Sequence, residues 1–191
     1  MKYLILIVLT LVVLSSVLLP NLSTQALAQV NSSFLTYTNT DLGFTIKYPS
    51  DWSIDDKNMS TIGIKFASPD GPGAGGVIVS ATETGKTIED FANSLPFNQS
   101  HGLKLIEMDK NGYFLSGHPA LRVIGIGSFG GPGEPGETQG IEPHDVKMMM
   151  FVTILGGKEY GVSYLALPES FPNQLQTAQT MIDSFQIISK Q

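Results

Sequence analysis

The stretch Gly43-Phe44-Thr45-Ile46-Lys47-Tyr48-Pro49-Ser50-Asp51-Trp52 predicts a strand, the end of that strand and a large core residue. Its first apolar side chains alternate with polar ones, which is the period of a strand with one buried face. Pro49 has no backbone N–H to donate to a neighbouring strand, so we expect regular pairing to end there. Trp52, the only tryptophan, follows a turn-type Ser-Asp pair, and its ring is large enough to close one end of a core.

The segments around this stretch predict a mostly β domain with two helices. The expected strands, besides 44–48, are 34–38, 61–67, 77–82, 103–109, 113–115, 120–126, 147–155 and 160–167. The first helix is expected to begin at Thr87, which with Asp90 resembles a capping box, and to end at Pro96. The second helix is expected over about 170–184, with an apolar stripe that continues to Phe185.

The connections between these elements set the expected fold class. Most are turns of hairpin length, which predicts an antiparallel sheet, and two helices on that sheet make the class α+β. Lys110-Asn111-Gly112 predicts a hairpin that pairs 103–109 with 113–115, whereas Gly117-His118-Pro119 is expected to break the chain. The predicted core residues are Phe44, Ile46, Tyr48, Trp52 and Phe185.

Composition excludes several classes of protein. A hydrophobic content of 42% and a charged content of 15% describe a globular domain with a substantial core. The formal charge of −6 argues against a nucleic-acid partner, because affinity for phosphates depends on clustered Lys and Arg. Since the chain has no cysteine, disulfides and thiolate metal sites are also excluded.

The N-terminus has the pattern of an export signal. Lys2 precedes an apolar run over 4–19, and Ala26-Leu27-Ala28 matches a small-x-small cleavage site. We therefore expect a signal peptide over 1–28, a polar lead-in over 29–33 and a domain over 34–188 in a secreted or extracytoplasmic protein. The alternative is that the segment is retained and anchors the protein to the outer face of the cell membrane, as its only contact with the membrane.

Three Asn-x-Ser/Thr sequons would remain after removal of the signal, at Asn31, Asn58 and Asn98. Each lies in a segment expected to be a loop, where an exported protein can carry a glycan. Chance is the alternative explanation, because Asn and Ser are frequent in this sequence.

The longest expected loop, 128–145, carries the candidate metal ligands. Glu137, Glu142, His144 and Asp145, with Glu134 nearby, would supply oxygen and nitrogen atoms to a divalent ion such as calcium or copper. Neither a His-x3-His spacing nor an EF-hand spacing is present, so solvated loop residues are the alternative interpretation. Loops of this length are often functional.

Two further motifs have simpler structural explanations. Thr84-Gly85-Lys86-Thr87 lies between a strand and a helix, as a phosphate-binding loop does, but Ser80 stands where the Walker pattern requires Gly, and a cap at Thr87 explains the same residues. Met148-Met149-Met150 suggests copper, since thioethers suit Cu(I). On a strand, however, Met149 faces away from its two neighbours, which favours core residues.

Three segments resemble the PsbP family, the extrinsic subunits of photosystem II, and the wider Mog/PsbP-like superfamily. They are 43–52, Gly117-His118-Pro119-Ala120-Leu121-Arg122, and 160–166 followed by the helix that ends at Phe185. The resemblance covers about residues 34–188 and implies an α-β-α sandwich in a non-enzymatic protein that docks on a larger assembly. Residues 29–33 leave little room for the arm that precedes the domain in the plant proteins, so we expect an exported PsbP-like domain outside photosynthesis.

Two functions follow as hypotheses. The first is a non-enzymatic binding or accessory module of a cell-surface or membrane-associated complex, with a protein partner. The alternative is a carrier of a small ligand or divalent ion that uses the 128–145 loop. No Gly-x-Ser-x-Gly motif nominates a catalytic serine, so we expect no enzyme activity.

The export hypothesis predicts the mass of the protein from its native source. Cleavage after Ala28 makes Gln29 the first residue. Intact-mass spectrometry should therefore give the mass of the chain from Gln29, with or without glycan on Asn31, Asn58 or Asn98. A mass that includes Met1 contradicts cleavage and supports the retained anchor.

Overall fold

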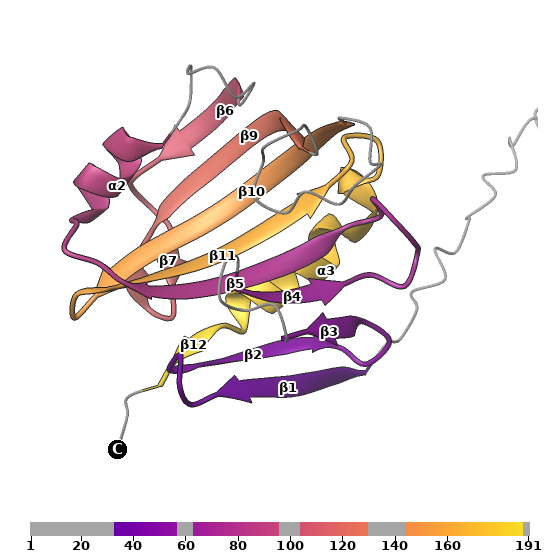
Figure 1. Cartoon of the computed structure of the whole chain (residues 1–191), viewed down its shortest axis with the longest axis horizontal. Helices are drawn as coiled ribbons and strands as arrows, with labels where there is room; N and C mark the ends of the chain where they lie inside the picture. The colour runs from indigo at the N-terminus through magenta and orange to yellow at the C-terminus, as the bar shows by residue number, and fades with distance from the viewer. Residues whose placement is uncertain (1–32, 57–62, 96–103, 130–143, 189–191) are drawn as a thin grey trace, which may run out of the picture. The chain divides into compact units, whose positions relative to one another are not determined.

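A seven-stranded antiparallel sheet runs through the computed structural model of the chain (Figure 1). In spatial order its strands are β3 (Ser53–Asp55), β4 (Ile64–Ala67), β5 (Gly76–Glu83), β11 (Lys158–Ala166), β10 (His144–Leu155), β9 (Leu121–Phe129) and β6 (Lys104–Asp109). The long central strand β10 pairs with β11 on one side and with β9 on the other.

The structure describes residues 33–56, 63–95, 104–129 and 144–188. They belong to a compact unit over Ser32–Gln191, and a second unit, Met1–Asn31, lies outside the described residues. The predicted signal peptide, most of the lead-in and the sequons at Asn31, Asn58 and Asn98 also lie outside them and stay predictions. Within the described ranges, neither helix is long and apolar enough to cross a membrane.

A smaller sheet contains the stretch that decides the fold. Its central strand β2 (Phe44–Pro49) lies between β1 (Phe34–Asn39) and the short β12 (Gln186–Ile187). As expected, β2 ends at Pro49, whose carbonyl accepts a hydrogen bond from the Trp52 backbone N–H at 3.0 Å and closes the turn.

Aromatic contacts join the two sheets. The ring of Phe66 on β4 lies 5.6 Å from that of Tyr37 and 5.3 Å from that of Tyr48. The predicted core residues are placed as follows: Phe44, Ile46 and Phe185 are fully buried, Trp52 is 6% exposed, and Tyr48 is half-buried. The aromatic rings of Tyr37, Tyr48 and Phe66 thus connect the smaller sheet to the large one.

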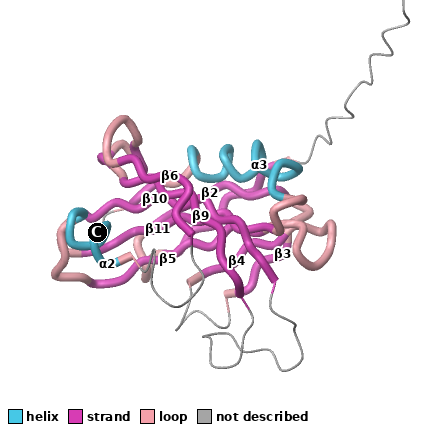
Figure 2. The backbone as a smooth tube through the Cα atoms, turned by 90° about the horizontal axis from the view of Figure 1, so that it is seen from above, coloured by secondary structure: helices cyan, strands magenta, loops and turns pink. Residues whose placement is uncertain are grey.

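Strand alternation divides the large sheet into two faces. One face, here called the α3 face, carries Val79, Val162 and Phe151, and it packs against the helix α3 (Phe171–Asp183) through Ala178, Met181 and Ile182. The opposite face, here called the α2 face, is covered at its β6-β9-β10 end by the helix α2 (Ile88–Ser94). These contacts place the two helices on opposite faces of the sheet, and the predicted α+β sandwich is confirmed. Figure 2 shows α3 alongside the strands and α2 near one end of them.

The capping box at the start of α2 is also confirmed. The Thr87 hydroxyl accepts a hydrogen bond from the Asp90 backbone N–H at 3.2 Å, and the Asp90 carboxylate accepts one from the Thr87 N–H at 2.9 Å. Hydrogen bonds that the Thr87 backbone N–H and hydroxyl donate to the Asp90 carboxylate lower the pKa of Asp90. The cap therefore accounts for the motif that resembles a phosphate-binding loop.

The predicted hairpin between 103–109 and 113–115 is wrong. Strand β6 pairs with β9, whereas β7 (Phe114–Leu115) pairs with β8 (His118–Pro119), so 117–119 continues a hairpin instead of breaking the chain. Ser116 and Gly117 have φ of +53° and +76°, which suits the tight turns that favour hairpins. Strand β6 also contains a register shift between Leu105 and Glu107, at the exposed Ile106.

Two glycines with similar φ angles give a matched test of how closely the start of β4 packs against β5. Gly63 and Gly71 have φ of +104° and +101°, but a Cβ at Gly63 would lie 2.2 Å from the Val79 carbonyl oxygen, whereas a Cβ at Gly71 would meet nothing within 4 Å. We expect Gly71→Ala to cost about 1–2 kcal/mol for its backbone alone. Gly63→Ala should cost about 3 kcal/mol or more, because overpacking adds to the backbone cost.

Urea unfolding followed by tryptophan fluorescence measures both losses. Equal losses for the two variants would contradict the close approach of Gly63 to β5.

Candidate ligand-binding pocket

The glycine-rich segment that joins β4 to β5 forms the edge of the candidate site. Its sequence is Ser68-Pro69-Asp70-Gly71-Pro72-Gly73-Ala74-Gly75, and the sequence alone predicts only an irregular loop. At Gly73, φ is +80° and a Cβ would lie 2.5 Å from the Leu167 side chain. The positive φ and this close approach therefore favour glycine where the loop crosses the end of β11.

Hydrogen bonds fix the loop to its surroundings. The Leu167 N–H donates to the Gly73 carbonyl at 3.1 Å, and the Ser68 N–H donates to the Gly75 carbonyl at 3.0 Å. The Asp70 carboxylate accepts from the Ser68 hydroxyl at 3.1 Å and from the Gln174 side-chain amide of α3 at 2.6 Å. The loop is thus held by both the sheet and α3.

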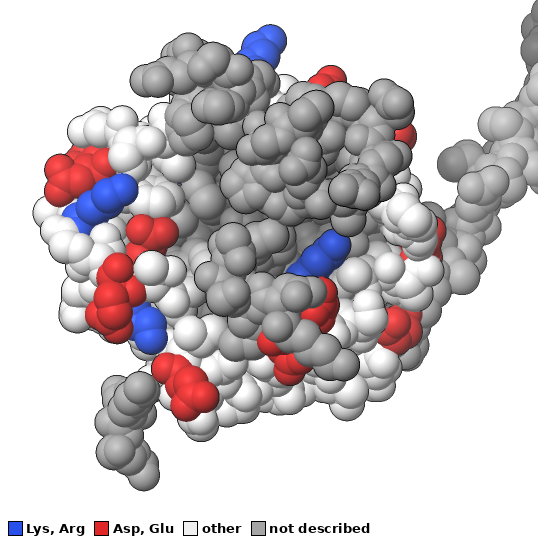
Figure 3. Space-filling view, viewed as in Figure 1, with Lys and Arg blue, Asp and Glu red and all other residues white. Residues whose placement is uncertain are grey.

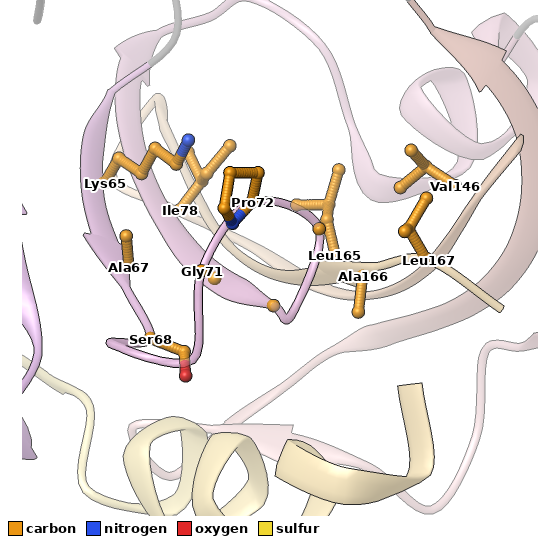
Figure 4. Close-up of a pocket in the computed structure, with 13 residues that line it drawn as sticks. Lys65, Ala67, Ser68, Gly71, Pro72, Ile78, Val146, Leu165, Ala166 and Leu167 are labelled. Atoms are coloured by element: carbon orange, nitrogen blue, oxygen red, sulfur yellow. The ribbon is translucent and has the colours of Figure 1, made fainter. Parts of the chain in front are cut away.

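A cavity of about 410 Å³ lies between this loop and the α2 face (Figure 4). Its wall consists of apolar side chains, glycines and a few polar groups, contributed by β4, the loop, β5, β10 and the end of β11. The lining residues are Lys65, Ala67, Ser68, Gly71, Pro72, Gly73, Gly75, Gly76, Ile78, Val146, Leu165, Ala166 and Leu167. In Figure 4 the loop separates the pocket from the helix α3.

Lys65 is the one charged side chain among these lining residues. It lies on β4 between the fully buried Ile64 and Phe66, so its side chain points to the opposite side, toward the pocket. Figure 4 shows its amino group beside Ile78. Within the described part of the chain, this amino group has no hydrogen bond and no ion pair.

Among the described residues, the other charges do not form a basic surface on the face seen in Figure 3. On the face seen in Figure 3, acidic side chains are spread around the rim, and Lys and Arg side chains are scattered among them. The chain as a whole carries a formal charge of −6. The Lys65 ammonium is therefore a local positive charge in an acidic protein.

The predicted metal site is placed only in part. The irregular segment is shorter than 128–145, because Ser128 and Phe129 belong to β9, while His144 and Asp145 belong to β10 and pair with them. Asp145 is exposed. Its neighbour Val146 lines the pocket, and because side chains alternate along a strand, Asp145 points to the opposite face of the sheet.

Glu137 and Glu142 lie outside the described residues, so the calcium or copper site stays a prediction. In the part of the chain that the structure describes, no group of three or more His, Asp or Glu side chains is placed to hold a metal ion. Met149 is buried in the core, and Met148 and Met150 face the other side of the sheet.

Comparison with solved structures identifies the fold. The solution structure of cyanobacterial PsbP (CyanoP) from Synechocystis sp. PCC 6803 matches 82% of this chain and 93% of its own, with a TM-score of 0.56 and 16% sequence identity. The chain has the PsbP-like fold. The resemblance predicted from the sequence is thus confirmed at the level of the fold.

Weaker similarity extends to two other proteins. LpqN of Mycobacterium tuberculosis, described as involved in cell envelope biogenesis, has a TM-score of 0.47 and 15% identity over 85% of this chain and 88% of its own. The Ran-binding protein Mog1p of Saccharomyces cerevisiae has a TM-score of 0.48 and 11% identity over 83% of this chain and 97% of its own. No family model and no curated protein sequence matches this chain.

Tyr164 couples the loop to α3 and gives the stability a pH dependence. Its hydroxyl donates a hydrogen bond to the Phe171 carbonyl at 3.0 Å. On the loop, a Cβ at Gly75 would lie 3.1 Å from the Tyr164 hydroxyl oxygen. Burial raises the pKa of Tyr164 to about 12. Because the unfolded chain loses this proton near pH 10, the free energy of unfolding should fall between about pH 10 and 12, by at most roughly 1.4 kcal/mol per pH unit.

Urea unfolding at pH 9, 10.5 and 11.5 checks this dependence. Tyr164→Phe should be less stable at pH 9 but should show a smaller loss with rising pH. Some loss remains in that variant, because burial also raises the pKa of Tyr160. An unchanged slope in Tyr164→Phe would contradict the assignment.

Proposed function

We propose that this chain is an exported, non-enzymatic binding domain that holds a small ligand. The ligand would lie in the cavity between the 68–75 loop and the α2 face, here called the Lys65 pocket. The observation that carries the proposal is the pocket itself, a cavity of about 410 Å³ with apolar walls and a loop fixed by hydrogen bonds. Ligand sites in proteins typically have volumes of about 300–1,000 Å³ and largely preformed walls.

The chemistry of the lining supports binding over catalysis. The lining supplies one ionisable side chain, Lys65, and one hydroxyl, that of Ser68, which is buried and already donates to Asp70. General acid–base and nucleophilic mechanisms rely on neighbouring groups that exchange a proton. A lone ammonium beside apolar walls suits recognition of a ligand.

The wider setting of the proposal is an accessory role outside the cytoplasm. The N-terminal pattern supports export, and the PsbP-like fold supports an accessory or binding domain with a protein partner. In this proposal the pocket, and not the 128–145 segment, is the ligand site. The partner of the domain would be a component of a cell-surface or membrane-associated complex.

Binding of a neutral fluorescent dye, N-phenyl-1-naphthylamine, tests the ligand site. Its emission should rise with the wild-type protein, because the dye leaves water for an apolar cavity. Ile78→Trp should abolish the rise in emission, because the larger ring would fill part of the cavity that Ile78 lines. Since Ile78 is only half-buried, the ring can extend into the cavity without disturbing the core.

The matched control is Ile154→Trp, which places the same ring on the same face of the sheet but outside the lining. It should bind the dye as the wild type does. Thermal unfolding establishes that both variants are folded. No binding by the wild type, or equal binding by the two tryptophan variants, overturns the proposal.

A further inference from the structure

We propose that the pocket selects a small amphipathic monoanion: a free carboxylate with an apolar body, whose charge pairs with the Lys65 ammonium. This inference rests on the proposed function, because it names the class of ligand for the same site. Two features of the pocket carry it: the apolar wall, and the charge of Lys65, which has no ion-pair partner among the residues that the structure describes.

The apolar wall sets the body of the ligand. Ile78 of β5, Val146 of β10 and Leu165 of β11 bring aliphatic side chains from three neighbouring strands to one side of the sheet. Leu167 and Pro72 add apolar surface from the two segments that border the strands. A ligand with a hydrocarbon body would cover this apolar surface and remove it from water, which favours binding.

The position of Lys65 sets the charge of the ligand. Its side chain passes beside Gly76 of the neighbouring strand β5, where a Cβ would lie 3.7 Å from the Lys65 Cε, an ordinary van der Waals contact. Among the residues that the structure describes, the nearest carboxylate in the strand register is that of Asp55, opposite Lys65 on β3. Asp55 has an interaction of its own, and no ion pair joins it to Lys65 within the described residues.

The number of charges favours a monoanion. A neutral ligand would cover part of the ammonium without replacing its bonds to water, which costs free energy. A cation would be repelled by Lys65. A dianion would bring a second charge, left unpaired, against the apolar wall. A monoanionic carboxylate neutralises the ammonium and leaves its hydrocarbon against the aliphatic side chains.

Displacement of the neutral dye by four ligands with eight-carbon chains tests the inference. The ligands are octanoate, octan-1-ol, octyltrimethylammonium and octyl phosphate, which is a dianion near pH 8. We expect octanoate to bind about tenfold more tightly than octan-1-ol, because a hydrogen bond between charged groups contributes more than a neutral one. Octyltrimethylammonium should bind least.

Variants of Lys65 identify the group responsible. Lys65→Gln and Lys65→Met should remove the preference for octanoate over octan-1-ol, which is measured in each variant as the ratio of the two displacement constants, whatever the change does to the affinity for the dye. Lys65 is exposed, so both variants should fold. Lys86→Gln is the control, because Lys86 is an exposed lysine outside the lining whose amino group contacts Ser94.

The outcomes separate this inference from the proposed function. If the dye binds but octanoate and octan-1-ol displace it equally, or if Lys65→Gln keeps the preference, the monoanion inference is wrong and the binding function stands. If octyl phosphate binds more tightly than octanoate, the single-charge argument is wrong. If the wild type binds neither the dye nor octanoate, both proposals fail.

Discussion

The register of β11 is the constraint on which both the core and the pocket depend. Val162 and Tyr164 of this strand face α3, while Leu165 faces the pocket. Because side chains alternate, a slip by one residue would turn Tyr164 toward the pocket and Leu165 toward α3. The pairing of β11 with both β5 and β10 prevents that slip, so one backbone alignment places the hydrophobic core and the ligand site together.

Local features of this fold were predictable from the sequence because local chemistry determines them. Pro49 ends β2 since it lacks a donor, and Thr87 begins α2 since its hydroxyl accepts from the Asp90 N–H. The hairpin partner of β6 was not predictable in the same way. Two turn-type sequences follow each other there, and only the long-range pairing of β6 with β9 shows that 116–117, not 110–112, closes the hairpin.

The pocket was not predicted for a related reason. Its wall combines β4, β5, β10 and β11, which are far apart in sequence, and a glycine-rich segment that by itself predicts only a loop. One signal was available: Lys65 is a charged residue that alternates with Ile64 and Phe66, so it had to face away from the core. Its neighbours on that side, such as Val146, became known only from the assembled sheet.

The register shift in β6 helps to protect this protein against aggregation. Strand β6 is an edge of the large sheet, where unpaired backbone groups invite another chain to add a strand and start an aggregate. The register shift at Ile106 interrupts the regular spacing of those groups, and the charged residues Lys104, Glu107 and Asp109 stand along the same strand. Bulges and charges at an edge oppose growth of the sheet from molecule to molecule. For a chain without cysteine, which cannot be stabilised by disulfides, this edge works against the growth of fibres from partly unfolded molecules.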